Sequence, residues 1–243
     1  MNCNTIDFKK FETKDVKNLL SNGTTNTKTA KNERETLILY LSPARQNSKG
    51  INLCPKASEG CLEACLYTAG RGVYANVQNS RINRTELYLK DRFKFLEQIA
   101  TEINKKAKKT SGELAVRLNG TSDIKLVEQL CSLYDIEKNV VFYDYTKIPS
   151  KAGERITETL HRYVVTFSRS ENNEAQCLDI LKNGGIVAMV FAKELPKTYK
   201  GFTVLDGDLR DDLMLDCPKG VILGLKAKGS ARKDRSGFVI TDY

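Results

Sequence analysis

The feature that most constrains the fold is a recurring pattern in which a short apolar run ends in a cluster of polar residues. The runs cover residues 36–41, 113–118, 139–143, 163–167, 185–191, 202–205 and 221–225. Short runs that are apolar throughout are typical of strands buried on both faces. Several are separated by segments long enough for parallel pairing. The pattern therefore predicts a single α/β domain with about seven mainly parallel strands.

Helical spacing of apolar residues fills several of the intervals between these runs. The longest such stretch is 79–109, and 124–134 and 174–181 are also expected to be helices. We expect a partial or irregular (β/α) barrel with the cysteine loop after its first strand, and an open doubly wound sheet is the alternative. Residues 1–34 are expected to form an N-terminal arm or a short docking helix, in front of an iron–sulfur α/β domain over residues 35–243.

The polar clusters that follow the runs are the predicted site, because ligands of such folds gather at the carboxyl ends of the strands. Carboxylates and lysines there can move protons if burial brings their pKa values toward neutrality, and arginines and lysines can bind anions. We expect catalytic roles for Lys147, Asp123, Tyr145, Asp206 and Lys226. We expect cofactor-binding roles for Arg117, Asn119, Ser122, Ser168 and Lys228. Turn formation and helix capping are the ordinary alternatives for Asp123 and Asp206.

A loop over residues 54–65 carries three cysteines with the spacing C-x6-C-x3-C. Pro55 and Gly60 favour a loop, and the residues after Gly60 favour a helix. One helical turn then separates Cys61 from Cys65, and Cys54 can fold back toward them. Three converging thiolates suit a [4Fe–4S] cluster with one iron left open for a ligand. A structural zinc site, with a fourth ligand such as His161 or Cys217, and metal-free core cysteines are the alternatives.

Composition indicates which partners and which cellular location to expect for this chain. The formal net charge of +9 allows nucleic acid as a partner, but lysines that merely solvate helix faces explain the same charge, so nucleic acid is not favoured. No apolar run approaches the roughly 20 residues of a membrane helix. The polar N-terminus does not resemble a signal peptide, and seven cysteines do not form a closed disulfide set. A reducing intracellular location is therefore expected.

Several segments resemble the phage gene product 88 family. They are the cysteine loop 54–65 and residues 81–85, 116–124, 142–147, 206–208 and 224–229, within a match that spans roughly residues 27 to 240. The resemblance implies a viral or prophage-derived protein that acts in the cytoplasm of the infected bacterial host. It implies no particular reaction.

A more distant similarity connects the chain with radical S-adenosylmethionine enzymes. These also place a three-cysteine loop after the first strand of a partial (β/α) barrel and leave one iron for the cofactor. Their loop has the spacing C-x3-C-x2-C, and a Gly-Gly-Glu segment follows their second strand. This chain has C-x6-C-x3-C and, after its second apolar run, Asn119-Gly120-Thr121-Ser122-Asp123. The similarity implies the fold and the cluster more directly than it implies radical chemistry.

Three functional hypotheses follow. The first is a [4Fe–4S] enzyme, a lyase or hydrolase, whose open iron binds and activates a small substrate for hydrolysis, elimination or desulfuration, with Cys54, Cys61 and Cys65 as metal ligands. The second is radical chemistry from bound S-adenosylmethionine. The third is a non-enzymatic, metal-stabilised phage protein that binds host nucleic acid or protein through its basic surface.

Overall fold

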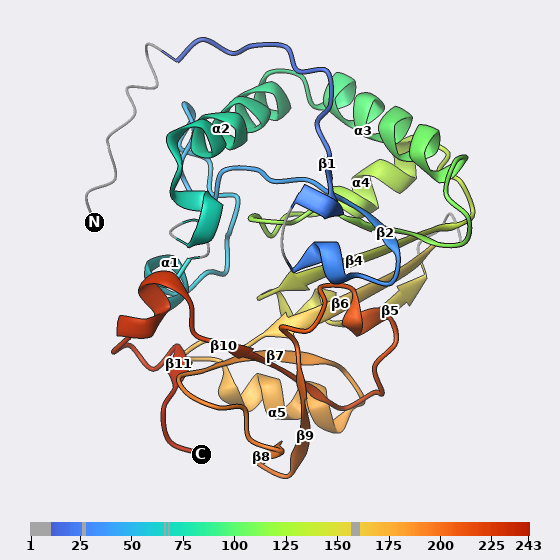
Figure 1. The fold of residues 1–243 in the computed structure, drawn as a ribbon. Helices are drawn as coiled ribbons and strands as arrows, with labels where there is room; N and C mark the ends of the chain where they lie inside the picture. Colours follow the sequence, from blue (N-terminus) through green and yellow to red (C-terminus); the bar gives the residue numbers. More distant parts are fainter. Residues whose placement is uncertain (1–10, 26–27, 66, 68, 157–160) are drawn as a thin grey trace.

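The structure is a computed structural model, and it describes residues 11–25, 28–65, 67, 69–156 and 161–243. Its centre is a mainly parallel sheet built from β2 (Glu35–Ile38), β3 (Leu114–Arg117), β4 (Val140–Thr146), β6 (Arg162–Ser168), β7 (Val187–Phe191), β10 (Ile222–Lys226) and β9 (Phe202–Asp206) (Figure 1). Neighbours along this series all pair in parallel. The prediction of an α/β fold with mainly parallel strands is confirmed.

The sheet is open rather than closed. Its strand order is β1-β2-β3-β4-β6-β7-β10-β9-β8, in which β1 (Ser21–Asn22) and β8 (Thr198–Tyr199) are antiparallel edge strands. Two further short strands lie off this path: β5 (Gly153–Ile156) pairs with β6, and β11 (Val239–Ile240) pairs with β7. The first five parallel strands follow the chain in order, whereas β10 comes between β7 and β9. The short strands β1, β5, β8 and β11 were not predicted, because segments of two to four residues show little periodicity.

The longer helices cover one face of the sheet. They are α2 (Ala75–Lys90), α3 (Arg92–Ala107), α4 (Leu126–Leu133) and α5 (Glu174–Lys182). Helices α2 to α4 share a core with Phe142 and Val165, and α5 packs with Phe167, two residues farther along β6. Alternate residues of a strand point to the same face, so all four helices lie on one side. This arrangement favours the first expectation over a doubly wound sheet, which carries helices on both faces.

Helices α2 and α3 divide a stretch whose spacing suggested continuous helix. Asp91 stands between them in extended conformation, and its carboxylate accepts a hydrogen bond from the Lys94 backbone N–H at 3.0 Å. This N-cap begins α3 as a separate helix, so the stretch predicted as one helix consists of two. Apolar residues of α3 at Phe95, Leu96 and Ile99 then face the core.

The opposite face of the sheet is covered by a short 3-10 turn, η7 (Leu213–Leu215), and its flanks. Met214 and Leu215 pack there against Val141 and Val164. This side therefore contains a loop segment where the other side contains helices. The ion pairs of Asp211, Asp212 and Asp216 described below lie along its margin.

The predicted docking helix at the N-terminus is wrong for residues 11–20, which are not helical; Phe8 lies outside the described residues. Leu19 and Leu20 are buried, and their backbone N–H groups donate to the Glu102 carboxylate at 2.7 and 2.9 Å. Lys14 exchanges two backbone hydrogen bonds with the Asn83 side chain. The segment docks on α2 and α3, as expected for an arm, because side chains satisfy its backbone instead of helical bonds. Across the described ranges, no helix is both long and apolar enough to cross a membrane.

Candidate functional site

Cys54 lies where the carboxyl ends of β2 and β3 meet. The Ala44 backbone N–H points at the Cys54 sulfur at 3.4 Å, and the Cys54 thiol donates to the Thr121 carbonyl at 3.7 Å. The Asp123 N–H donates to the Leu53 carbonyl at 2.8 Å. The cysteine loop and the loop after β3 are therefore fastened to each other beside this thiol.

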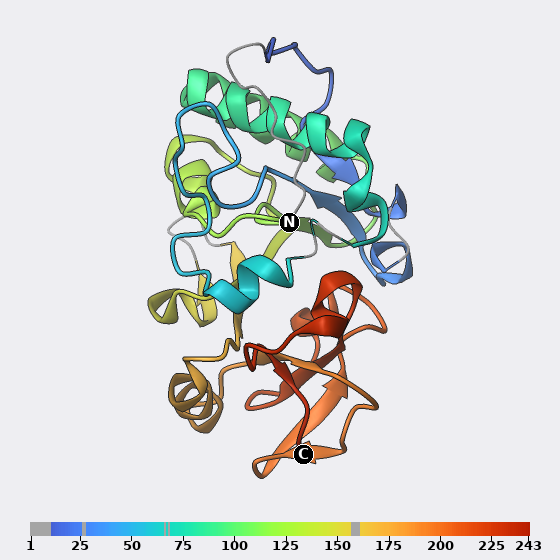
Figure 2. The ribbon, with the colours of Figure 1, turned by 90° about the vertical axis from the view of Figure 1, so that its left-hand side faces the viewer.

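The other two cysteines belong to the short helix α1 (Glu59–Glu63) and the residues that follow it. Ser58 caps α1 by accepting a hydrogen bond from the Cys61 N–H at 3.2 Å. The Glu171 carboxylate accepts from the Ser58 hydroxyl at 2.6 Å and from the Gly60 N–H at 2.9 Å. Figures 1 and 2 both show α1 beside the segment that follows β10. There the Ser230 hydroxyl donates to the Glu63 carbonyl at 2.7 Å.

The three thiols are close enough to influence one another's ionisation. Burial is the main cause that raises the pKa of Cys54 to about 12, and the neighbouring Cys65 and Cys61 raise it further. Burial also raises the pKa of Cys61 and of Cys65. No disulfide joins the described cysteines. The convergence of Cys54, Cys61 and Cys65 on one metal centre stays a prediction.

This cysteine group is not a ready-made site for a single metal ion. Within the residues that the structure describes, no three or more His, Cys, Asp or Glu side chains are gathered so as to hold one ion. The ligands of one tetrahedral zinc lie about 2.3 Å from the metal and thus close together. His161, considered as a fourth ligand, lies elsewhere, buried near the start of β4, where its Nδ1 is 3.2 Å from the Val140 carbonyl.

Lys147 and Asp123 are the two predicted catalytic residues that lie beside the cysteines. The Lys147 ammonium donates to the carbonyls of Arg169 and Ser168 at 3.1 and 3.4 Å. Its charge opposes the effect of burial on the pKa of Cys61. Asp123 accepts from the Lys147 N–H at 2.8 Å and lies 3.4 Å from the ammonium of Lys151, which is almost fully buried. Asp123 therefore orders this edge through bonds to its neighbours.

Asn119 and Ser122 belong to a buried network around Asp144, on the face covered by helices. The Asp144 carboxylate accepts from the Asn119 backbone and side-chain N–H groups at 2.8 and 3.0 Å, and from the Tyr163 hydroxyl at 3.2 Å. Ser122 donates to the Asn119 side-chain oxygen at 2.9 Å. Burial raises the pKa of Asp144 to about 6. These bonds hold the loop after β3 in place and leave Asn119 occupied within the protein.

Arg117 and Tyr145 face the other side of the sheet, in a second buried network. The Arg117 guanidinium pairs with Asp211 at 3.0 Å and lies 4.8 Å from the centre of the Tyr145 ring. Lys28 reaches Asp211 at 3.2 Å, and the Tyr143 hydroxyl donates to the same carboxylate at 3.0 Å. Burial would raise the pKa of Asp211, but Arg117 and Lys28 hold it at about 2.

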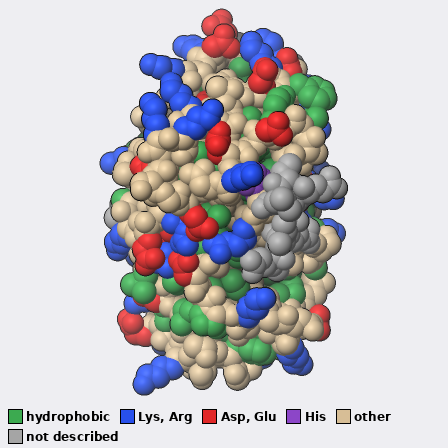
Figure 3. All heavy atoms as spheres, turned by 90° about the vertical axis from the view of Figure 1, so that its right-hand side faces the viewer, with side chains coloured by type: hydrophobic (Ala, Val, Ile, Leu, Met, Phe, Trp, Pro, Cys, Tyr) green, Lys and Arg blue, Asp and Glu red, His purple; other side chains and the backbone are tan. Residues whose placement is uncertain are grey.

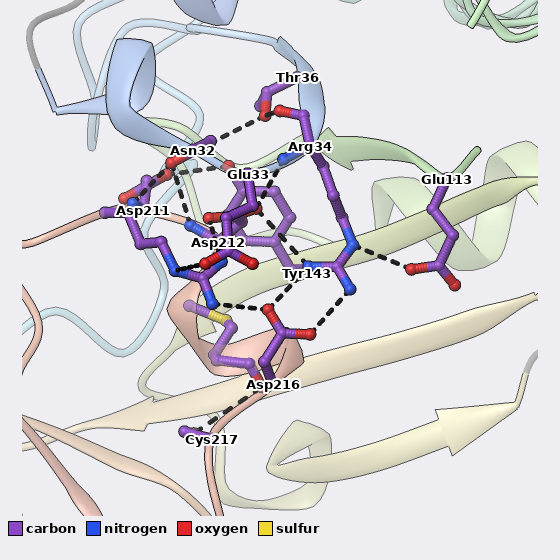
Figure 4. Close-up of polar contacts among 12 residues, drawn as sticks. Asn32, Glu33, Arg34, Thr36, Glu113, Tyr143, Asp211, Asp212, Asp216 and Cys217 are labelled. Atoms are coloured by element: carbon purple, nitrogen blue, oxygen red, sulfur yellow. Dashed lines mark hydrogen bonds and ion pairs between the residues drawn. The ribbon is translucent and has the colours of Figure 1, made fainter. Parts of the chain in front are cut away.

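This network continues into a set of ion pairs between the N-terminal segment and the η7 region (Figure 4). Arg34 binds both carboxylate oxygens of Asp216, at 2.8 and 2.7 Å, and also contacts Glu113 and Asp212. Arg210 binds Asp212 and Asp216 from the other side at 2.8 and 2.7 Å. Nearly every charge in this group has an opposite partner, which is the pattern of a structural clamp.

Asp206, Lys226 and Lys228 form a third group, at the ends of β9 and β10. Asp208 accepts from the Lys226 backbone N–H at 3.0 Å and from the Lys228 ammonium at 2.7 Å. Asp206 and Lys226 line an exposed cleft of about 270 Å³. An adjoining cleft of about 420 Å³ shares Lys226 and includes Arg232 and Asp234. The predicted site residues thus divide into four places, of which the cysteine edge contains only Lys147 and Asp123 from the predicted catalytic set.

Arg81, from α2, was not among the predicted site residues. Its Cζ lies 5.2 Å from the Tyr40 ring centre and 5.5 Å from that of Tyr67. Its Nη1 is buried and has no hydrogen-bond partner in the described part of the chain. Burial lowers the pKa of Arg81, and the neighbouring Tyr40, Tyr67 and Cys65 oppose this. An apolar-polar pattern cannot identify such a residue, because its isolation depends on the tertiary fold.

A family model described as Gene product 88 matches residues 17–242. The chain belongs to the Gene product 88 family. This family is one of bacteriophage proteins, so the resemblance noted in the sequence is confirmed at this level. Searches of the curated proteins and of the solved structures found no match. The wider similarity to radical S-adenosylmethionine enzymes therefore gains no support from these comparisons.

Proposed function

We propose that this phage protein is a [4Fe–4S] enzyme that uses Cys54, Cys61 and Cys65 as ligands and keeps one iron open for a small substrate. The observations that support the proposal are the contact of Cys54 with the loop after β3 and the influence of Cys65 and Cys61 on the pKa of Cys54. The convergence of all three thiols on one cluster is part of the proposal. Soft thiolates are the ligands that iron–sulfur clusters prefer.

A cluster demands a different arrangement of thiolates from that of a single metal ion. The three thiolates of an open-site cube bind three different irons, so their sulfurs do not gather around one point as the ligands of a single ion do. The polar surroundings fit as well, since the cations Lys147 and Arg81 lie near Cys61 and Cys65.

The bound cluster would supply a Lewis-acidic iron with an open coordination position. The protein's own residues hold the ligands in place. Ser58 and Glu171 fix the first turn of α1, and Lys147 places a positive charge beside Cys61, which favours its thiolate form. Asp123 orders the backbone at Lys147. With helices on a single face, we interpret the open sheet as the partial (β/α) barrel expected from the sequence.

Iron and sulfide analysis with a visible spectrum, after anaerobic purification, tests this proposal. We expect about four irons and four sulfides per chain and a broad absorption band. Cys54→Ser should lose most of the iron. Cys217→Ser is the matched control, because Cys217 is also half-buried but lies in the η7 region and should leave the iron content unchanged. Wild-type protein without iron, or equal losses in both variants, would contradict the proposal.

The two other hypotheses are weaker candidates. The predicted cofactor-binding residues Arg117, Asn119 and Ser168 are engaged in bonds within the protein, so no specific observation favours bound S-adenosylmethionine. For nucleic acid, Lys226 and Lys228 pair with Glu194 and Asp208. Figure 3 shows basic and acidic side chains intermingled on the face that it displays. A single-sign basic patch would be the expected footprint of nucleic acid.

A further inference from the structure

The cleft of about 420 Å³ lies at the carboxyl ends of three parallel strands, β7, β10 and β11 (Figure 1). Its lining comes from the residues that follow β7, from the end of β10, from the 3-10 turn η8 (Gly229–Lys233) and from Thr241 after β11. We call it the Arg232 cleft. Its volume is within the range of small-molecule sites, which is about 300–1,000 Å³.

The chain reverses its direction across the sheet at this cleft. After β7 the chain passes to β8 and β9, on the far side of β10. After β10 it returns to β11, which pairs with β7 at Val190 and Phe191. Because β10 already pairs with one edge of β7 at Phe191, β11 lies on the opposite edge. In open α/β sheets, ligands bind beyond the carboxyl ends of the strands where the strand order reverses, and the Arg232 cleft has this position.

Three cations line the cleft, and each comes from a different segment: Lys193 after β7, Lys226 at the end of β10 and Arg232 on η8. Among the residues that the structure describes, neither Lys193 nor Arg232 forms an ion pair; Arg232 Nε donates to the Ala227 carbonyl at 3.3 Å. Lys226 pairs with Glu194 at 3.0 Å, but the Glu194 side chain is 91% exposed. Water screens this pair, so a ligand with a higher charge can displace Glu194 at little cost.

The second carboxylate of the lining, Asp234, is bound by its own loop. It accepts hydrogen bonds from the Ser236 hydroxyl at 2.7 Å and from the Val239 backbone N–H at 2.9 Å. Within the described ranges of the chain, Asp234 contacts no lysine or arginine at ion-pair distance. The charges of Lys193 and Arg232 therefore remain available to an anionic ligand.

The inner wall of the cleft is apolar and is built from small side chains. Ala227, Ala231 and Val239 line the cleft, and they also pack against Ala64, the residue before Cys65. Alanines leave room beside the backbone, and the organic part of a ligand can occupy this space. The apolar cluster also lies between the cleft and the cysteine loop, so the two places are distinct.

We propose that the Arg232 cleft binds a small phosphate monoester, with its phosphate on Lys193, Lys226 and Arg232 and its organic part against the alanines. A phosphate monoester has close to two negative charges and three acceptor oxygens, which suits a group of three cations. A guanidinium binds phosphate through two parallel N–H groups. A simple carboxylate has one charge and would leave part of this group unused. The site goes beyond the proposed function, because it includes none of the three cysteines.

Calorimetric titration of the full chain at about 0.15 M salt tests the proposal, because this salt concentration weakens attraction to scattered surface charges. The probes are inorganic phosphate and adenosine 5′-monophosphate, and their counterparts without phosphate are acetate and adenosine. Arg232→Gln removes one cation of the cleft. Arg235→Gln is the matched control, because Arg235 is an exposed arginine of the same segment that does not line the cleft. Ala192→Leu fills the cleft and keeps all of its cations.

We expect one site per chain for both phosphate probes, and at least about tenfold weaker binding of acetate and adenosine. Arg232→Gln should weaken both phosphate probes about tenfold, and Arg235→Gln should change them by less than about twofold. Ala192→Leu should weaken the nucleotide more than inorganic phosphate.

Three results would overturn the proposal: no binding of either phosphate probe, acetate binding as tight as that of phosphate, or equal weakening in Arg232→Gln and Arg235→Gln. The last result would indicate general attraction to a basic segment, as for nucleic acid. None of these results depends on iron, so each would leave the proposed function intact. Protein without iron that still binds phosphate in this way would contradict only the proposed function.

Discussion

Two groups of buried arginines in this protein have opposite surroundings. Around η7, Arg34, Arg117 and Arg210 each contact at least one carboxylate, and these contacts bring together residues from 34 to 216. On α2, Arg81 and Arg84 have no carboxylate partner among the described residues, and Arg81 Nη1 and Arg84 Nε are buried without an acceptor, as Arg117 Nε is in the first group; Arg84 Nη1 donates to the Ser80 hydroxyl. Paired charges hold a fold together, whereas unpaired ones leave binding capacity for another group.

The presence or absence of a carboxylate partner distinguishes arginines that stabilise the fold from arginines available for binding. Sequence patterns cannot make this distinction. Arg81 and Arg117 are the same residue type, and both lie near a predicted site. Arg117 is structural because it pairs with the Asp211 carboxylate, and Asp211 lies 94 positions farther along the chain. The following predictions test this division, from the largest effect to the smallest.

Asp211→Asn should cause the largest loss of stability. The substitution leaves the buried charges of Arg117 and Lys28 without their carboxylate, and breaking a buried pair in this way typically costs about 3–5 kcal/mol. Urea unfolding measures the change. Glu113→Gln is the control, because Glu113 is an exposed partner of Arg34 and should contribute less than about 1 kcal/mol. Similar losses in the two variants would show that this network is not the clamp described here.

The stability of the wild-type protein should fall between about pH 4 and pH 2. Burial opposes the ionised form of Asp211, but Arg117 and Lys28 keep its pKa at about 2, below the usual 3.8. Since the folded-state pKa is the lower one, the contribution is complete above about pH 4 and disappears as the pH falls through 2. The difference corresponds to roughly 2 kcal/mol. Urea midpoints across this range should show a smaller decrease in Asp211→Asn than in the wild type, and equal slopes would contradict the assignment.

Gly60→Ala should destabilise the region around α1, which is held by packing rather than by ion pairs. A Cβ at this position would collide with the Ser236 hydroxyl and would lie 2.8 Å from the Phe238 Cβ. Overpacking of this kind costs between about 1 and 3 kcal/mol. Urea unfolding and iron retention should both decrease. Leu62→Ala is the control, because Leu62 is exposed on the same helix, and it should change stability by less than about 0.5 kcal/mol. A change as large as that of Gly60→Ala would mean that the loss comes from weakening of the helix and not from overpacking at residue 60.

Arg81→Met should have the smallest effect on the metal-free protein, with a change within about 1 kcal/mol. The removal of an unpaired buried charge relieves a cost, and the loss of contacts with the Tyr40 and Tyr67 rings partly cancels this gain. Urea unfolding of the metal-free chain gives the value. A loss as large as that of Asp211→Asn would mean that Arg81 is a structural cation and would remove the distinction drawn above.

The central strands and helices could be predicted because their signals are local. The runs that became β3, β4, β6 and β7 are mainly apolar, and the helical spacing of α3 and α4 is clear. The N-terminal helix failed for a tertiary reason. Phe11, Val16 and Leu19 have helical spacing, but the backbone near Leu19 binds the Glu102 carboxylate instead of its own carbonyls.

The candidate site was predictable only in part. Cysteine spacing predicts that Cys54, Cys61 and Cys65 converge, which stays a prediction, and the position of Lys147 after a strand indicated that it lies near Cys61. The spread of the other predicted residues over three places could not be foreseen, because the sequence does not show that β10 comes between β7 and β9. The role of Glu171 as the anchor of α1 likewise depends on a contact 113 residues away from Ser58.

The contact between α1 and the segment after β10 has a consequence for how the protein is made in a cell. Ser230 and Glu63 are 167 residues apart, so the cysteine loop leaves the ribosome long before the segment that packs against it. During that interval α1 lacks its partner, and the three thiols are exposed to whatever oxidants the host contains. The oxygen supply of the culture during synthesis, and not only the care taken during purification, should then decide what fraction of the chains can accept iron.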